Sequence, residues 1–468
     1  MVPGGGGYRR RVVEVRTEAG RVRGILESGV AVFRGIPYAA APLGALRFAA
    51  PVAARPRDGD ALAFGPRPPQ PGVSASDGNW LTLNVWSPDP GPDAGLPVLV
   101  WIHGGAYVIG SSDLPEYDGT RLARDGVVLV TLNYRVGFEG FAEIAGAPAN
   151  RGLLDQVAAL EWVRDNVRAF GGDPAQVTVF GQSAGGGSVA CLLAMPRAAG
   201  LFRRAVAQSV PGTVFAPELA RDVAGTFAAE LGLRASVADL SDVDPDLLVA
   251  ATEEVTAKAG AHVARWGRAA HRSVLIAPVV DGDVLPTTPW AAVHDVPLLA
   301  GHTRDEHRLF SAFGEVTAEQ VAAAVEVFAP SPYPPAGPTD LYEWILGDWL
   351  FRMPSLRLAE RATTAHFYEL TWEGTLGACH GLDVPLVFGT LTRGAPAGLI
   401  ADPEAAEAVS AQMRAAWISF ATTGDPGWPS FADGSTRLFD VEPAVVPYPE
   451  VESRRIWAGH DFPALELS

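Results

Sequence analysis

Cysteine, lysine and long apolar runs are all scarce in this chain of 468 residues. Two cysteines, Cys191 and Cys379, cannot build a disulfide framework, which excludes a small secreted fold held together by disulfides. No segment reaches the roughly 18 consecutive apolar residues that a membrane-spanning helix needs. Residues 1–15 contain no apolar run of signal-peptide length. These absences lead us to expect a cytoplasmic protein that does not enter a membrane.

Positive charge is also in deficit. The chain has 36 Lys and Arg against 53 Asp and Glu, so its net charge is −17. Such a chain gains no counterion-release attraction to nucleic acid, and an anionic membrane surface repels it. We therefore expect no nucleic-acid or membrane partner, and a small molecule as ligand. The sequence leaves a monomer and a homodimer equally open.

Short apolar runs alternate with amphipathic stretches along the middle of the chain. Residues 97–102, 127–134 and 176–180 are rich in β-branched residues and predict strands buried on both faces, as in a parallel sheet. Between the last two, apolar residues recur at steps of three and four, which predicts a helix with one core face. Further strands are expected at 204–209, 296–300 and 366–372, and further helices at 216–233, 317–328, 341–363 and 402–423. The pattern predicts one α/β domain over residues 1–468, with a largely parallel sheet, flanking helices and lid helices.

The stretch "VFGQSAGGG" carries the first candidate for catalysis. Ser183 lies between Gly181 and Gly185, after a predicted strand and before a predicted helix. A G-x-S-x-G motif in this context is typical of a nucleophile elbow, where a sharp turn exposes the serine hydroxyl. The competing interpretation is a small residue in a glycine-rich turn.

A serine nucleophile also requires hydrogen-bond donors for the oxyanion that forms on the substrate. The amide N–H of Ala184, directly after the serine, is one candidate. The stretch "WIHGGAY" (101–107) follows an earlier predicted strand, and Gly104 and Gly105 leave its amides unobstructed. The same glycine pair could simply end a strand.

The serine needs a base, and the base needs a carboxylate to orient it. In the chain order Ser, acid, His, the base candidate is His380, which lies in a glycine-flanked loop after the strand expected at 366–372. His302 and His307 are its nearest rivals. The acid is expected after the strand at 296–300, where Asp305 and Glu306 stand side by side. Spacing alone does not choose between these two carboxylates.

At this point the residues resemble a known family, the type-B carboxylesterases of the α/β-hydrolase superfamily. The resemblance runs in order over roughly residues 20–440. It is carried by "FRGIPYAAAPLGALRFAAP" (33–51), "LTLNVWSP" (81–88), "VWIHGGAY" (100–107), "LNYRVG" (132–137), "NRGLLDQVAALEWV" (150–163), "FGGDPAQVTVFGQSAGG" (170–186), "RDE" (304–306), "FRMP" (351–354) and "CHGLDVPLVFG" (379–389).

The resemblance implies a catalytic triad of Ser183 as nucleophile, Glu306 as acid and His380 as base. It implies an oxyanion hole formed by Gly104, Gly105 and Ala184. It also implies a structural ion pair between Arg135 and Asp155, and a supporting place beside the triad for Ser209 and Gln182. No metal and no organic cofactor is expected.

The chain departs from the family pattern in several places. The two cysteines of the family's N-terminal disulfide are replaced by Arg67 and Trp80, so we expect no disulfide there. Gly78 stands where the family has an acidic residue, so we expect Arg34 to lose that ion-pair partner. The loop at 67–80 is short and the region 311–340 is trimmed, which predicts a wider or shallower gorge. The candidates for lining that gorge are Trp344, Trp349, Phe310 and Phe388.

Gln182 replaces the glutamate that usually precedes the nucleophile, which removes a negative charge beside Ser183. Together with the short 67–80 loop, this argues against a cationic substrate. We expect a serine hydrolase that cleaves small to medium, neutral carboxylic esters through an acyl-enzyme. The same triad could hydrolyse carbamates or amides or transfer acyl groups. A non-catalytic binding protein is a further alternative, although all three triad residues are present.

Overall fold

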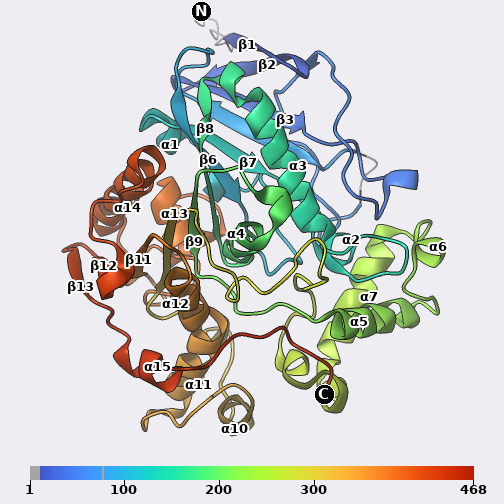
Figure 1. The fold of residues 1–468 in the computed structure, drawn as a ribbon, viewed down its shortest axis with the longest axis vertical. Helices are drawn as coiled ribbons and strands as arrows, with labels where there is room; N and C mark the ends of the chain where they lie inside the picture. Colours follow the sequence, from blue (N-terminus) through green and yellow to red (C-terminus); the bar gives the residue numbers. More distant parts are fainter. Residues whose placement is uncertain (1–10, 76–77) are drawn as a thin grey trace, which may run out of the picture.

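The computed structural model describes residues 11–75 and 78–468. The expectation that residues 1–15 contain no signal peptide therefore falls largely outside the described residues. A single continuous sheet runs through the molecule (Figure 1). Its strand order is β1-β2-β3-β5-β7-β6-β8-β9-β10-β11-β12-β13, with the short β4 paired to β2. The strands are β1 Val12–Thr17, β2 Gly20–Glu27, β3 Val30–Pro37, β4 Gly59–Asp60, β5 Thr82–Ser87, β6 Leu96–Ile102, β7 Val128–Leu132, β8 Gly172–Gln182, β9 Arg204–Gln208, β10 Leu298–Thr303, β11 Ala365–Leu370, β12 Ser435–Phe439 and β13 Ala444–Pro447.

The centre of the sheet is parallel, as the sequence predicts. All neighbours from β7 through β6, β8, β9, β10 and β11 to β12 are parallel, whereas β1, β2, β3 and β5 form an antiparallel extension. Parallel strands are joined by crossovers that place helices on the sheet faces. The strands predicted at 97–102, 127–134, 176–180, 204–209, 296–300 and 366–372 correspond to β6, β7, β8, β9, β10 and β11.

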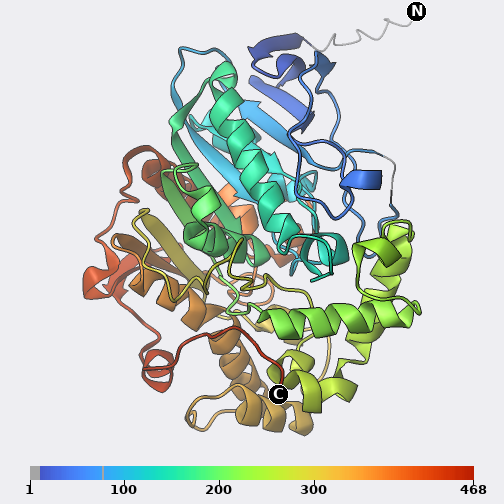
Figure 2. The ribbon, with the colours of Figure 1, turned by 45° about the vertical axis from the view of Figure 1, so that its right-hand side comes forward.

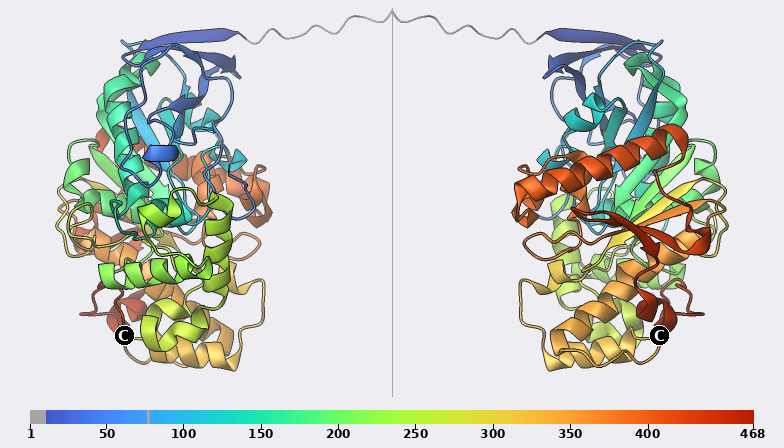
Figure 3. Two further views of the ribbon diagram at one scale, coloured as in Figure 1. Left: turned by 90° about the vertical axis from the view of Figure 1, so that its right-hand side faces the viewer. Right: turned by 90° about the vertical axis from the view of Figure 1, so that its left-hand side faces the viewer.

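Helices cover both faces of this central sheet. They are α1 Thr120–Arg124, α2 Gly137–Phe141, α3 Arg151–Asn166, α4 Ala184–Ala194, α5 Pro217–Glu230, α6 Val237–Leu240, α7 Pro245–Ala257, α8 Val263–Trp266, α9 Arg308–Ser311, α10 Ala318–Val327, α11 Pro338–Gly347, α12 Met353–Glu360, α13 Asp383–Phe388, α14 Pro403–Thr423 and α15 Val451–Ile456. Helix α14 crosses one face (Figure 3), while α3 runs along the other.

Side-chain alternation along the strands divides the core into two layers. On β6, Val98, Val100 and Ile102 pack in the layer that includes α3 and α4. Leu99 and Trp101 point to the opposite layer, which includes α13 and α14. Successive residues of a strand face opposite sides, so a strand covered on both faces must be apolar throughout. This requirement explains why the central strands read as unbroken apolar runs.

The helix predicted at 341–363 is interrupted. Helix α11 ends at Gly347, a wide π-helical turn spans Asp348–Arg352, and α12 begins at Met353. Pro354 lacks a backbone N–H and cannot continue a regular α-helical ladder. The wide turn buries an ion pair between Asp348 and Arg352, and an Arg352 Nη2–H donates to the carbonyl of Arg304 over 2.6 Å.

A group of helices from the middle of the chain lies beyond one end of the parallel strands. Figure 2 shows α5, α7, α10 and α11 grouped at that end. The loops that follow β6, β8, β10 and β11 open toward the same region, and these loops carry the candidate catalytic residues. In the described part of the chain, no helix combines the length and apolar character that crossing a bilayer requires.

Candidate active site

Ser183 occupies the sharp turn between β8 and α4. Its backbone angles are φ 58° and ψ −127°, in a region that side-chain-bearing residues rarely adopt. The Ser183 N–H donates to the carbonyl of Gln208 over 3.0 Å, and the Gly187 N–H donates to the Ser183 carbonyl over 2.8 Å. These bonds hold the turn between strand and helix. A strained, over-determined serine at a strand-to-helix turn is what a nucleophile elbow requires.

The glycines around Ser183 are required by close backbone contacts. A Cβ on Gly185 would lie 2.0 Å from the carbonyl oxygen of Ile102, and one on Gly181 would lie 2.5 Å from the backbone of Gly185. A Cβ on Gly186 would lie 2.5 Å from the carbonyl oxygen of Gln208. The helix therefore packs directly against the strand ends, and any side chain here would push the turn apart.

His380 and Glu306 form a buried pair. Nδ1 of His380 donates to Oε2 of Glu306 over 2.6 Å, and both side chains are almost fully shielded from solvent. Burial alone would raise the pKa of Glu306, but His380 and the N–H of Thr303, 2.9 Å from Oε1, together with Ser209, hold it below its usual value. Glu306 is therefore ionised and fixes the His380 proton on Nδ1, which leaves Nε2 free to act as a base.

The structure distinguishes Asp305 from Glu306, the two acid candidates between which the spacing could not choose. Asp305 faces away from His380 and accepts hydrogen bonds from Arg304 over 3.1 Å and from the Ala378 N–H over 2.9 Å. Arg308 lies 3.3 Å from the same carboxylate. Asp305 therefore ties the His380 loop to the end of β10, and Glu306 alone reaches the imidazole.

The rival histidines are held elsewhere. His302 contacts the carbonyl of Thr303 over 3.1 Å and the hydroxyl of Tyr448 over 3.4 Å. Burial lowers the pKa of His302 and of His307 to about 4. Neither histidine bonds to Ser183 or Glu306. His307 packs edge-on against Tyr342 at a ring separation of 5.3 Å.

Gln182 contacts the reactive nitrogen of His380. The Gln182 side-chain amide nitrogen lies 3.1 Å from Nε2 of His380. An NH₂ group can only donate, so Nε2 accepts, which agrees with the proton on Nδ1. Ser183 and His380 are not joined by a hydrogen bond in this structure. Catalytic hydrogen bonds are often long in a ligand-free site and shorten when substrate binds.

Several backbone amides close to Ser183 in the chain or in the fold have no hydrogen-bond acceptor among the described residues. Among the described residues, none accepts a hydrogen bond from the N–H of Gly104, Gly105 or Ala106. The Ala184 N–H lies in the first turn of α4, where no intrahelical acceptor exists. Gly104 lies directly against the elbow, since a Cβ on it would be 3.3 Å from Cβ of Ser183. These free amides are suited to an oxyanion.

Ala106 is a candidate that the sequence analysis missed. It has φ 55°, a left-handed conformation that disfavours most residues, and it follows Gly105 at φ 111°. This turn directs consecutive amides to one side. The only sequence signal was its place after the glycine pair, and alanine gave no reason to expect a left-handed backbone.

Ser209 is buried directly after β9 with φ 49°. Its hydroxyl helps to lower the pKa of Glu306, yet its Oγ makes no hydrogen bond of regular geometry. The Ser209 N–H donates to the carbonyl of Gly301 over 2.8 Å and links β9 to β10. Ser209 thus lies beside the acid, where the resemblance placed it.

One cavity of about 1290 Å³ opens over Ser183 and His380. Phe310 and Trp349 line it, as expected, whereas two other aromatic candidates do not. The Trp344 indole donates to the hydroxyl of Ser453 over 2.8 Å, and Phe388 packs against Trp101 in the core layer of α13. Periodicity and residue type alone could not distinguish a core aromatic from a lining one. Within residues 11–75 and 78–468, no group of three or more His, Cys, Asp or Glu side chains is arranged to hold a metal ion.

The family departures have structural outcomes. Arg34 pairs with Glu27 over 2.5 Å, so it has a partner on the neighbouring strand in place of the missing acidic residue. Both cysteines are buried and unpaired. The expected ion pair is present: Arg135 binds the carboxylate of Asp155 through two hydrogen bonds of 2.8 Å, with both side chains fully buried.

The fold and the site together define a serine hydrolase of the α/β class, and comparison with known proteins agrees. Residues 11–331 match the model of the Carboxylesterase family. The para-nitrobenzyl esterase of Bacillus subtilis (strain 168) is 35% identical over 94% of this chain and 97% of that protein. The phenmedipham hydrolase of Pseudarthrobacter oxydans is 36% identical over 89% of this chain and 92% of that protein. A solved structure of a PNB esterase, 34% identical, superposes with a TM-score of 0.82 over 95% of this chain and 99% of that one.

This chain belongs to the carboxylesterase family. It is a carboxylic ester hydrolase with the α/β-hydrolase fold, and its substrates are small-molecule esters.

Proposed function

We propose that Ser183, His380 and Glu306 carry out ester hydrolysis through an acyl-enzyme. The observation that supports this most directly is the geometry of His380. Its Nδ1 is bound to a buried carboxylate at 2.6 Å, while its Nε2 lies next to the residue that precedes Ser183. This tautomer is the one that can accept a proton from the serine hydroxyl.

The reaction follows from these positions. His380 Nε2 takes the Ser183 proton as Oγ attacks the ester carbonyl, and Glu306 stabilises the resulting imidazolium. The amides of Gly104, Gly105 and Ala184 donate to the oxyanion. His380 then protonates the leaving alcohol. A water molecule, activated by the same nitrogen, releases the acid and restores Ser183.

Ala106 joins this proposed oxyanion hole as a fourth donor candidate. Its free amide and left-handed backbone support this role. Preorganised amides of this kind act at the transition state, where the negative charge develops, and removing a single donor typically costs about 100- to 1000-fold in kcat.

We expect the esters to be small to medium in size. The cavity of about 1290 Å³ is somewhat larger than the roughly 300 to 1000 Å³ of ordinary ligand sites, so esters up to medium size fit with space to spare.

We also propose that residues 1–468 form one domain, because one continuous sheet runs from β1 to β13. A cytoplasmic location is supported by two buried, unpaired cysteines.

The first test compares the protein with its Ser183→Ala variant on para-nitrophenyl acetate, butyrate and octanoate. We expect Ser183→Ala to lower kcat by at least about 1000-fold, because the nucleophile is lost while binding and the oxyanion hole remain. Circular dichroism and thermal melting of both proteins control for folding. A folded variant that keeps most of the turnover would refute the role of Ser183.

A further inference from the structure

The lining of the catalytic cavity includes a cationic side chain for which the described residues supply no ion-pair partner. Among the described residues that line the cavity, Arg272 is the only arginine or lysine. It follows the short turn Gly267–His271. Its Nη1 is shielded from solvent and makes no hydrogen bond, and no carboxylate of the described residues pairs with it. Glu253 and Glu315, which also line the cavity, are exposed and make no ion pair with Arg272.

The most deeply buried arginines of the fold are compensated, whereas Arg272 is half-buried. Arg135 is bound by Asp155, Arg47 donates to Glu139 over 2.5 Å, and Arg151 donates to four backbone carbonyls. Removing a charge from water is costly unless a partner replaces the water. Burial lowers the pKa of Arg272 to about 10, so the guanidinium stays charged at neutral pH. The net charge of −17 means that carboxylates are abundant, yet among the described residues none forms an ion pair with Arg272.

The side chain is held in place without being neutralised. Its guanidinium carbon lies over the ring of Phe215 at 5.9 Å, and Phe215 is buried. The Arg272 N–H donates to the carbonyl of Ala269 over 3.2 Å, which fixes the backbone. A guanidinium that lies over an aromatic ring still presents its N–H groups along its own edge, where they can donate hydrogen bonds. The side-chain nitrogens of Arg272 can therefore donate hydrogen bonds to a group that enters the cavity.

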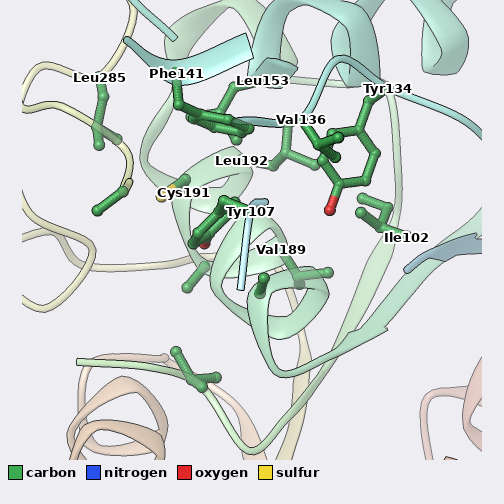
Figure 4. Close-up of a cluster of buried hydrophobic side chains, with 14 of the residues drawn as sticks. Ile102, Tyr107, Tyr134, Val136, Phe141, Leu153, Val189, Cys191, Leu192 and Leu285 are labelled. Atoms are coloured by element: carbon green, nitrogen blue, oxygen red, sulfur yellow. The ribbon is translucent and has the colours of Figure 1, made fainter. Parts of the chain in front are cut away.

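Arg272 lines the same cavity as Ser183 and Tyr107. It is close enough to Tyr107 for the two side chains to affect each other's pKa. Tyr107 packs among Val189 and Cys191 of α4 (Figure 4), and its hydroxyl would lie 2.3 Å from a Cβ on Gly187. Gly187 is one turn of α4 beyond Ser183.

His380 borders this cavity together with two aromatic rings. Its ring stacks on Phe351 at 4.1 Å and approaches Phe310 at 5.4 Å. A bound ester must place its leaving oxygen toward His380 and its carbonyl oxygen toward the free amides. The acyl substituent then extends away from His380 into the rest of the cavity, whose lining includes Tyr107 and Arg272.

We propose that Arg272 binds a carboxylate at the far end of the acyl group, so that the enzyme prefers monoesters of dicarboxylic acids. This inference rests on the proposed function and replaces the expectation of a neutral ester. Hydrolysis of the monoester anion adds one water molecule across the ester bond and releases an alcohol, a dicarboxylate and one proton. Guanidinium and carboxylate match in charge and in paired hydrogen-bond geometry.

The test compares matched acyl chains with and without the terminal carboxylate. The substrates are the monoethyl esters of succinate, glutarate and adipate, and ethyl butyrate, valerate and caproate as neutral partners, with ethanol release as the readout. In the Arg272→Met variant we expect the ratio of kcat/KM for monoester over neutral ester to fall by about 10- to 100-fold, the range of a charge-assisted hydrogen bond, mainly through KM. Arg272→Lys should fall less, because it keeps the charge but loses the paired geometry.

Arg268→Met is the matched control. Arg268 is exposed, lies four residues away and does not line the cavity, so its loss changes the net charge equally without touching the site. The ratio should stay at the wild-type value. An equal fall in Arg268→Met would show a long-range charge effect and overturn the proposal. An unchanged ratio in Arg272→Met, with Ser183-dependent hydrolysis of the neutral esters, would overturn it too and leave the proposed function standing.

Two further measurements separate the remaining outcomes. Acetoxyacetate carries its carboxylate on the alcohol side, and a loss confined to this substrate in Arg272→Met would overturn the acyl-side assignment. Calorimetric binding of glutarate to the Ser183→Ala variant tests the subsite without turnover. We expect binding that Arg272→Met weakens by about 10-fold or more. No hydrolysis of any ethyl ester would contradict the proposed function, while glutarate binding that depends on Arg272 would still support the subsite.

Discussion

Replacing Gln182 with glutamate should shift the pH dependence of the enzyme. The side-chain amide of Gln182 donates to Nε2 of His380 over 3.1 Å, and it can do so only while that nitrogen is unprotonated. A carboxylate at the same place would instead accept a hydrogen bond from the protonated nitrogen. The Gln182→Glu variant therefore stabilises the imidazolium, which cannot act as a base toward Ser183.

The distance sets the size of this effect. Two opposite unit charges about 4 Å apart interact by about 4 kcal/mol near a protein surface. Because the cavity is open and water screens the pair, the expected range is that of a carboxylate beside a cation, about 1 to 3 pH units. We therefore expect the acidic limb of the kcat/KM profile to move upward by this amount, with activity recovering at alkaline pH.

The assay is hydrolysis of para-nitrophenyl butyrate from about pH 5 to about pH 9, where an essential base is revealed by the acidic limb. The Gln182→Met variant is the control, because it removes the donor without adding a charge and should move the limb less. If Gln182→Glu is folded and its acidic limb coincides with that of the unaltered enzyme, the amide does not face the catalytic nitrogen and the proposed arrangement is wrong.

Two buried carboxylates lead to stability predictions. Asp155→Asn should lower the free energy of unfolding by about 3 to 5 kcal/mol in urea denaturation, because Arg135 would be left buried and unpaired. The exposed pair of Arg21 and Asp58 is the control, and Asp58→Asn should lower the free energy of unfolding far less, because water screens that pair; equal losses would contradict the reasoning. Burial raises the pKa of Asp383 to about 6, so the folded protein holds this proton more tightly than the unfolded chain, and its contribution to stability declines as pH rises from about 4 to about 6. The Asp383→Asn side chain cannot ionise. The melting temperature of this variant minus that of the unaltered protein should therefore increase from about pH 4 to about pH 6. A difference that does not change with pH would contradict the assignment.

The parallel core was predictable because its signal is local. Strands covered on both faces must be apolar at every position, and β6, β7 and β8 show this directly in their residues. The nucleophile turn was predictable for a similar reason, since the glycines around Ser183 leave no room for side chains. The helix expected at 341–363 was only partly right: Pro354 was a local signal that a regular helix could not continue, but the ion pair that the wide turn Asp348–Arg352 buries forms only in the folded core.

The amino-acid sequence by itself determined the order of the motifs along the chain and the turn that carries Ser183. It also determined the set of residues from which the base and the acid are drawn. Only the tertiary structure decided that Glu306 reaches His380 while Asp305 binds Arg304, because neighbouring residues differ in direction and not in spacing. It also decided that Arg272 lines the cavity with no ion-pair partner within residues 11–75 and 78–468. Burial and pairing are properties of segments distant in the chain, so no local pattern could reveal them.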